Sequence, residues 1–156
     1  MTLKPIDRGV EWLLAAVLAL LVLVGGAQIV WRFVLNDPLP WVVESSVVLM
    51  VWATMLCGYV GVRRNVHLSA DFTGLQMSAA TRWWLDLLCL LLCLLFVAVY
   101  GIGSLKVIDA MDGIPFTSIP LQQPVLYWSL PVGAALMAVA LLARIRTHLL
   151  TKGKAD

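Results

Sequence analysis

Four long stretches of apolar residues, separated by short polar segments, make up most of this chain. They cover approximately residues 10–35, 41–62, 83–105 and 121–143. Each is near or above the roughly 20 apolar residues that an α-helix needs to span a hydrocarbon core of about 30 Å. Inside hydrocarbon, every backbone N–H and C=O group must find its partner within the segment, so stretches of this kind are helices. The sequence therefore predicts an all-α integral membrane protein with four transmembrane helices.

The composition leaves no room for a soluble domain beside these helices. The chain has 156 residues, of which 62% are hydrophobic and 13% are charged. We expect residues 1–156 to form a single membrane domain. The first apolar stretch is longer than the core of a signal peptide, which has about 7–15 residues, and no small-residue cleavage site follows it. We therefore expect this stretch to be retained as a helix.

The basic residues are distributed unequally on the two sides of the predicted membrane. Of the 11 basic residues, all but two fall on one side: Lys4, Arg8, Arg63, Arg64, Arg82, Arg144, Arg146, Lys152 and Lys154. Arg32 and Lys106 fall on the other side. By the positive-inside rule, both termini and residues 63–82 face the cytoplasm. Charges spread along a membrane face can contact anionic lipid, and they do not form the clustered patch of a nucleic-acid-binding protein.

Arg32 and Glu44 are charged residues placed just inside the outer membrane interface. They lie near the two ends of a short link that contains Pro38 and Pro40, so we expect them at similar depth in a tight helical hairpin. A charge at this depth is costly unless it is paired or reaches water. We predict an Arg32–Glu44 ion pair, or a contact from Glu44 to another subunit. The alternative is that each side chain simply reaches the lipid headgroups.

A second group of polar residues follows the second apolar stretch at the inner face. Arg63 and Arg64 end this stretch, and His67 precedes Asp71 by four residues. If the segment is helical, His67 and Asp71 share a face and can form a hydrogen bond, which favours a structural contact over a proton relay. Residues 68–80 fit either a short amphipathic helix on the membrane surface or an ordinary polar loop.

Small residues recur every four positions within the second apolar stretch. Ala53, Cys57 and Gly61 share one face of the predicted helix. We expect a narrow seam there that lets another membrane helix approach closely. In the fourth stretch, Pro131 lies well inside the helix and is expected to kink it.

Motifs for catalysis and cofactor binding are missing from the sequence. His67 and His148 lie outside the apolar stretches, which disfavours a haem held between the helices. Cys57, Cys89 and Cys93 lie within apolar helices, where we expect them to pack. We find no phosphate-binding loop, zinc-protease motif or catalytic triad, and no carboxylate near the bilayer midplane, where transporters place their sites. The sequence predicts no enzyme, cofactor, metal site or substrate site in this chain.

The order and spacing of several polar and aromatic residues resemble a known family over nearly the whole chain. In chain order, these residues are Arg32, Trp41-x-x-Glu44, Trp52, Gly58, Arg63-Arg64-x-x-His67-x-x-x-Asp71, Ser118-x-Pro120 and Tyr127-x-x-x-Pro131-x-Gly133. The pattern is similar to the small membrane subunit, of DctQ type, of tripartite ATP-independent periplasmic (TRAP) transporters.

This resemblance implies a subunit that neither binds substrate nor catalyses a reaction. In the family, the small subunit packs against a large permease that carries the sodium and substrate sites, and a periplasmic binding protein delivers the solute, typically an organic acid. The small subunit enlarges the scaffold against which the permease moves. The resemblance thus implies a sodium-coupled importer in the bacterial inner membrane. The family often has a second acid directly after the first, where this chain has Ser45, so Glu44 would act alone in binding a basic group of the permease.

Two other functions are weighed as alternatives on the residues taken alone. A stand-alone small multi-helix exporter would carry a carboxylate deep within a helix, whereas Glu44 lies close to a helix end. A membrane assembly factor without a transport role needs no such residue, and the sequence leaves that function open.

Overall fold

The computed structural model describes residues 4–37, 39–64 and 78–152. The helices in these residues are α1 (Lys4–Val34), α2 (Trp41–Arg63), α3 (Ala79–Ala110), the short α4 (Pro124–Tyr127) and α5 (Ser129–Lys152). Four spans, namely α1, α2, α3 and the α4–α5 segment, are long and apolar enough to cross a membrane. The predicted all-α fold with four membrane-spanning helices is confirmed.

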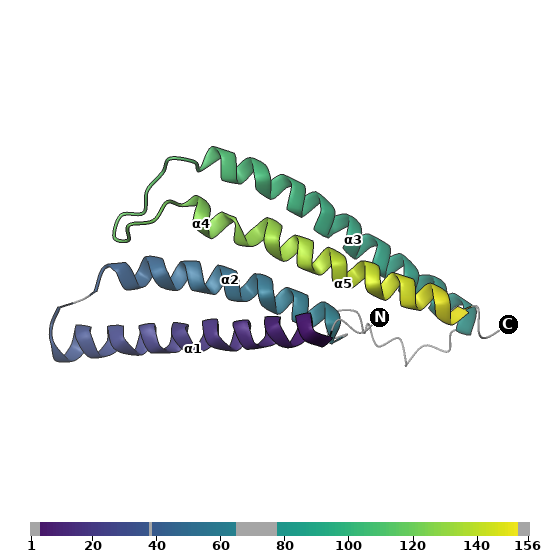
Figure 1. Cartoon of the computed structure of the whole chain (residues 1–156), viewed down its shortest axis with the longest axis horizontal. Helices are drawn as coiled ribbons and strands as arrows, with labels where there is room; N and C mark the ends of the chain where they lie inside the picture. The colour runs from purple at the N-terminus through teal and green to yellow at the C-terminus, as the bar shows by residue number, and fades with distance from the viewer. Residues whose placement is uncertain (1–3, 38, 65–77, 153–156) are drawn as a thin grey trace.

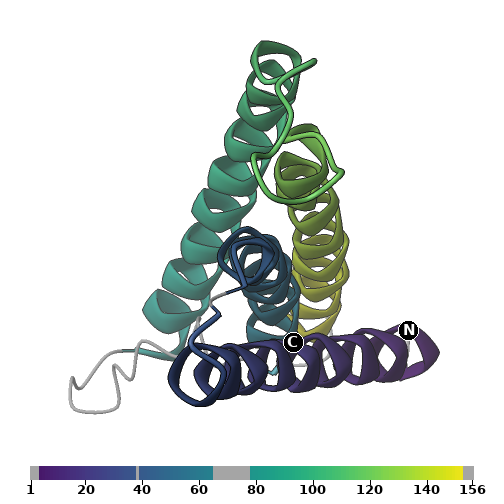
Figure 2. The ribbon, with the colours of Figure 1, turned by 90° about the vertical axis from the view of Figure 1, so that its left-hand side faces the viewer.

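The helices form an open row instead of a closed bundle. α2 packs against α1 and against α5, whereas α3 packs along α4 and α5 and touches α2 where the Tyr100 hydroxyl lies 4.0 Å from Met55 Sδ. Figure 1 shows the resulting order from bottom to top, which is α1, α2, α5 and α3. Figure 2 shows α1 crossing below α2, on the opposite side from α3 and α5. α1 and α3 are therefore edge helices, each packed along the length of one spanning neighbour.

The two ends of the row differ in what they contain (Figure 1). α1 begins and α5 ends at the same end of the molecule, which we call the termini end. The α1–α2 link and residues 111–123 lie at the opposite end, which we call the loop end. There, Asn36 adopts a left-handed conformation with φ of 55°, and the Asp37 N–H donates to the Trp31 carbonyl at 3.3 Å. This is a helix-ending motif that asparagine tolerates, and it stops α1.

The helix bounds differ from the predicted spans mainly in the second half of the chain. α3 begins before residue 83 because the Ser78 hydroxyl caps it, accepting a hydrogen bond from the Thr81 N–H at 3.2 Å. The last helical segment begins at Pro124 and is interrupted at Trp128. Pro131 explains the interruption, since it has no N–H to donate to the carbonyl four residues earlier. The predicted disturbance of this helix by Pro131 therefore takes the form of a break.

Glycines bring α2 and α5 into close contact at the centre of the row. A Cβ atom placed on Gly133 would lie 2.7 Å from Met55 Cβ, and one placed on Gly58 would lie 2.9 Å from Met137 Sδ. Neither position can hold a larger residue without movement of its neighbour. Tyr59, which follows Gly58 in α2, is only 1% exposed. The contact between α2 and α5 is therefore closely packed.

The predicted seam of small residues does not form this contact. Ala53 is buried, but Cys57 is exposed and Gly61 is half-buried, so the three residues do not share one buried surface. The close approach within the chain uses Gly58 and Gly133 instead. Cys57 is left on the outer surface of α2. A role for the seam in binding a partner stays a prediction.

Candidate functional site

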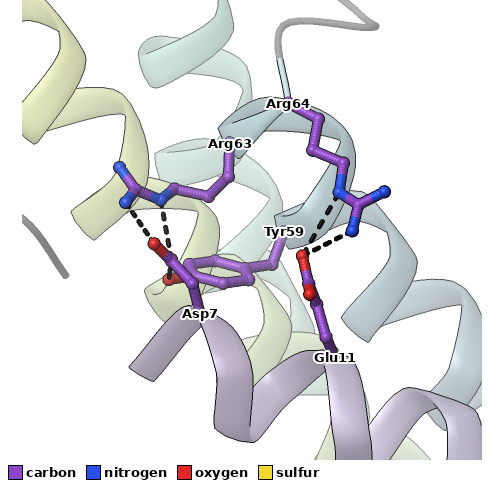
Figure 3. Close-up of polar contacts among 5 residues, drawn as sticks. All are labelled: Asp7, Glu11, Tyr59, Arg63 and Arg64. Carbon is purple, nitrogen blue, oxygen red and sulfur yellow. Dashed lines mark hydrogen bonds and ion pairs between the residues drawn. The ribbon is translucent and has the colours of Figure 1, made fainter. Parts of the chain in front are cut away.

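Polar side chains gather at the termini end, where α1 begins and α2 ends. Arg63 donates from Nε to Asp7 Oδ1 at 2.7 Å and from its terminal nitrogen to Asp7 Oδ2. The Tyr59 hydroxyl donates to the same Oδ1 atom at 2.6 Å (Figure 3). A bidentate arginine–carboxylate pair with a third donor is strong and geometrically specific. It fixes the first turn of α1 against the last turns of α2.

A second ion pair lies beside the first (Figure 3). Arg64 donates to Glu11 Oε1 from Nε at 3.2 Å and from a terminal nitrogen at 2.8 Å. Glu11 lies four residues after Asp7 and so shares its face of α1. The Arg64 and Glu11 side chains are 64% and 42% exposed, so solvent screens this pair more than the Arg63–Asp7 pair. We call Asp7, Glu11, Tyr59, Arg63 and Arg64 the α1–α2 polar cluster.

Polar contacts also connect the other helices at the termini end. Arg144 of α5 donates to the carbonyl of Val62, in the last turn of α2, at 3.4 Å. His148 of α5 stacks on Trp83 of α3 with ring centroids 5.1 Å apart, and its Nε2 lies 3.2 Å from the Trp83 carbonyl oxygen. Each pair of neighbouring spans in the row is therefore joined by a polar contact at this end.

At the loop end, Glu44 of α2 binds the backbone that precedes α4. Its carboxylate accepts hydrogen bonds from the backbone N–H groups of Thr117 at 2.8 Å, Ser118 at 2.7 Å and Ile119 at 3.1 Å. Hydrogen bonds to an ionised acceptor are stronger than those between neutral groups. One side chain thus satisfies three consecutive backbone donors that no helix or strand satisfies.

Further contacts order the loop end, one between α2 and α4 and one within residues 111–123. The Trp52 indole N–H donates to the Val125 carbonyl at 3.2 Å. Within the loop, the Phe116 N–H donates to the Leu121 carbonyl at 3.0 Å. Ile114 and Leu121 remain 41% and 45% exposed at the surface of this loop. The loop end therefore presents an ordered, partly apolar surface.

The arrangement of these groups favours holding helices together over binding a polar solute. Among the described residues, no group of three His, Cys, Asp or Glu side chains is placed to hold a metal ion. An open groove of about 260 Å³ lies between α3 and α5 and is lined by apolar residues that include Val97, Gly101, Pro131 and Ala134. The charged groups described above engage other parts of the same chain.

Comparison with known proteins identifies the family. Residues 21–151 match the family model described as the DctQ component of tripartite ATP-independent periplasmic transporters. The chain belongs to the DctQ family. The resemblance seen in the sequence is thereby confirmed. DctQ proteins are a family of transporter components and not of enzymes, and the four apolar spans make this member a multi-pass membrane protein.

A curated relative supports the DctQ assignment. The C4-dicarboxylate TRAP transporter small permease protein DctQ of Vibrio cholerae serotype O1 is 28% identical over 94 residues, which are 60% of this chain and 40% of the relative. The chain thus spans about two fifths of the length of the curated relative that it matches. The DctQ family match begins after Asp7 and Glu11 and includes Glu44 and residues 111–123.

One predicted contact is wrong in this DctQ-family chain. Arg32 is exposed, lies with its guanidinium carbon 5.7 Å from the Phe33 ring centroid, and forms no ion pair with a described residue. Glu44 does not pair with Arg32, because its carboxylate is occupied by the three backbone N–H groups from Thr117 to Ile119. The hairpin geometry suggested a pair, but a distant loop supplies better donors.

Of the other predicted site residues, some lie in described helices and two lie outside the described residues. Arg63 and Arg64 lie in the α1–α2 polar cluster, and Trp41 begins α2 with 41% of its surface exposed. His67 and Asp71 lie outside the described residues, as does most of the suggested interfacial helix over 68–80. Roles for these side chains in binding a partner stay predictions.

Sequence reasoning missed Asp7, Glu11 and Tyr59. A signal was present, since two acids four residues apart begin the first helix and two arginines end the second. In an antiparallel hairpin these two ends meet, so the acids and arginines can pair.

Gln28, a polar residue within the apolar part of α1, was also missed. Its Oε1 atom is buried without a hydrogen-bond partner in the described chain.

Proposed function

We propose that this chain is the small permease subunit of a sodium-coupled TRAP transporter that imports an organic acid. In this proposal it forms a hetero-complex with the large permease subunit in the bacterial inner membrane. It enlarges the fixed scaffold of that permease and leaves the solute and sodium sites to it. The name of the Vibrio cholerae relative, a C4-dicarboxylate transporter small permease, supports a small dicarboxylate as the solute.

The uncovered apolar surface of the edge helices carries this proposal. None of the most apolar stretch of α1 is buried within the chain, and only 11% of that stretch is buried in α3, compared with 28% in α2. Association of helices in lipid depends on close packing and polar contacts. A row with long free surfaces on both edges is suited to attachment to a larger membrane protein.

The polar contacts support a scaffold over a solute-binding subunit. Asp7, Arg63 and Glu44 bind groups of their own chain and are therefore already satisfied. A carboxylate solute requires hydrogen-bond donors that converge on a pocket at membrane depth. The groove between α3 and α5 offers an apolar lining in place of such donors. The charged groups instead tie the row together at both of its ends.

The distribution of charge supports an orientation with the termini end in the cytoplasm. Arg8, Arg63, Arg64, Arg144 and Arg146 lie toward the termini end, which matches the positive-inside rule. The loop end then faces the periplasm. In this proposal, the ordered surface of residues 111–123 meets the periplasmic solute-binding protein there.

Co-purification from the native membrane tests the proposal. The chain is tagged at its C-terminus, extracted in mild detergent, and its partners are identified by mass spectrometry. We expect an equimolar large multi-helix permease. For comparison, Gly133→Leu disrupts the α2–α5 contact and should lower the recovery of that permease. Recovery of the self-associated chain alone would contradict the proposal in favour of a small exporter, and a varying set of unrelated membrane proteins would favour an assembly factor.

A further inference from the structure

Residues 114–128, which lie at the loop end between α3 and α5 (Figure 1), form a unit that is bonded within itself. The Phe116 N–H donates to the Leu121 carbonyl at 3.0 Å, and the Gln123 N–H donates to the Ile114 carbonyl at 2.9 Å. These bonds pair the two arms of the loop, and α4 follows the second arm directly. We call residues 114–128 the cap. Because its own backbone groups bond to one another, the cap can change position and keep its shape.

The backbone is interrupted on both sides of the cap. Before it, Gly113 follows the end of α3 and has a φ of 76°, a left-handed conformation. After it, the helix breaks at Trp128, because Pro131 has no N–H to donate to the preceding turn. The hydroxyl of the buried Ser129 donates across this break to the Leu126 carbonyl at 2.6 Å and keeps α4 joined to α5. Neither side of the cap is therefore a continuous helix, and helical segments bend at such points.

Two side chains of α2 supply the hydrogen bonds between the cap and the spanning helices within the part of the chain that the structure describes. Glu44 accepts from the N–H groups of residues 117–119, and the Trp52 indole donates to the Val125 carbonyl at 3.2 Å. Glu44 and Trp52 are eight residues apart, which separates them by about 12 Å along α2. The cap is thus attached to one helix at two separate points.

We propose that the cap is a lid that opens and closes as one unit about Gly113 and Trp128. Glu44 and Trp52 set its closed position. Opening breaks the hydrogen bonds from the cap to α2 and keeps those within the cap, so α1, α2, α3 and α5 stay in place. It also releases the Glu44 carboxylate, which is then free to bind a cationic group at the loop end. The motion belongs to the chain alone and does not depend on the proposed function.

Coupling between the two attachment points tests whether the cap moves as one unit. Trp52→Phe keeps an aromatic ring and removes the N–H that binds the Val125 carbonyl. We expect hydrogen exchange at the amides of residues 117–119 to become about two- to tenfold faster, the effect of one lost hydrogen bond, although that bond lies six residues further along the chain. Exchange is measured by NMR on the full-length chain in detergent. Trp41→Phe is the matched control, because the Trp41 indole donates no hydrogen bond to a described residue, and it should leave these rates unchanged.

The amides within the cap distinguish a moving lid from an unfolding loop. Glu44→Gln should speed exchange of the Trp52 indole proton by at least about tenfold, because charge-assisted bonds at the other attachment point are weakened. In both variants, the Phe116 and Gln123 amides and those within α2 should exchange at their wild-type rates. Equal acceleration at Phe116 and Gln123 would overturn the inference, since the loop would then be unfolding. So would faster exchange within α2, or a Trp52→Phe variant with unchanged rates at residues 117–119, since the two points would then open independently.

Discussion

The Glu44 carboxylate lies 2.7 Å from the backbone nitrogen of Ser118, although 74 residues separate the two in the sequence. The neighbouring N–H groups of Thr117 and Ile119 donate to the same carboxylate. Glu44 also lies in the first turn of α2, where the helix dipole favours a negative charge. The position of residues 111–123 on the row of helices thus depends on one ionised side chain.

Removing this charge should loosen the loop without unfolding the helices. Glu44→Gln replaces the ionised acceptor by a neutral amide, whereas charge-assisted hydrogen bonds contribute about 1.5–3 kcal/mol each. We expect hydrogen exchange at the amides of residues 117–119 to become at least about tenfold faster, as measured by mass spectrometry in detergent. Glu11→Gln, at the termini end, is the control and should leave this loop protected. Unchanged protection in Glu44→Gln would show that the loop is held by other contacts.

The two ion pairs at the termini end should differ in their contribution to stability. Asp7→Asn weakens a bidentate, partly buried pair and should lower the free energy of unfolding by about 1–2 kcal/mol. Glu11→Gln removes an exposed pair that solvent screens, so we expect a much smaller loss. Thermal unfolding of both variants in the same detergent measures the difference. Equal losses would mean that burial of the Asp7–Arg63 pair adds nothing to the free energy of unfolding.

The close contact of α2 and α5 should make Gly133 sensitive to the smallest enlargement. Gly133→Ala places a methyl group 2.7 Å from Met55 Cβ, and such overpacking costs about 1–3 kcal/mol. Gly103→Ala in α3 is the matched control, because a Cβ atom there meets nothing within 4 Å. That substitution should stabilise the helix by up to about 1 kcal/mol. Opposite shifts in melting temperature are therefore expected, and shifts of the same sign would contradict the packing described for Gly133.

The outward-facing part of the small-residue seam can be tested for a partner. Cys57 is exposed on α2, whereas Ala53 is buried within the chain, so enlarging Ala53 disturbs the chain itself. Cys57→Leu should reduce the permease that co-purifies while leaving the melting temperature of the isolated chain unchanged. If Cys57→Leu recovers as much permease as the wild type, this face of α2 contacts lipid.

The membrane-spanning helices could be predicted from composition alone, because a helix satisfies all backbone hydrogen bonds of a long apolar segment within that segment. The helix ends were less predictable. The start of α3 depends on the Ser78 cap, and the break at Trp128 depends on a carbonyl that Pro131 leaves without a donor. Both are local effects that cannot be predicted from the length of an apolar stretch.

Some contacts of the polar residues could be anticipated from the sequence, and others could not. The Asp7–Arg63 pair joins the two ends of one helical hairpin, so the opposite charges at those ends are enough to predict it. Glu44 suggested a similar local pair with Arg32, but its donors come from residues 117–119. Nothing in the local pattern of α2 indicates which loop folds over its first turn. Long-range contacts of this kind depend on how α3, α4 and α5 pack.

Solute uptake into proteoliposomes that contain this chain with the proposed permease and solute-binding protein tests the proposed scaffold role most directly. We predict that Asp7→Asn and Glu44→Gln lower the maximal uptake rate in proportion to the loss of assembled complex. The half-saturating solute concentration and the sodium dependence should stay at their wild-type values. A substitution in this chain that shifts either quantity, with the amount of complex unchanged, would contradict the account by giving the small subunit a part in the solute or ion site.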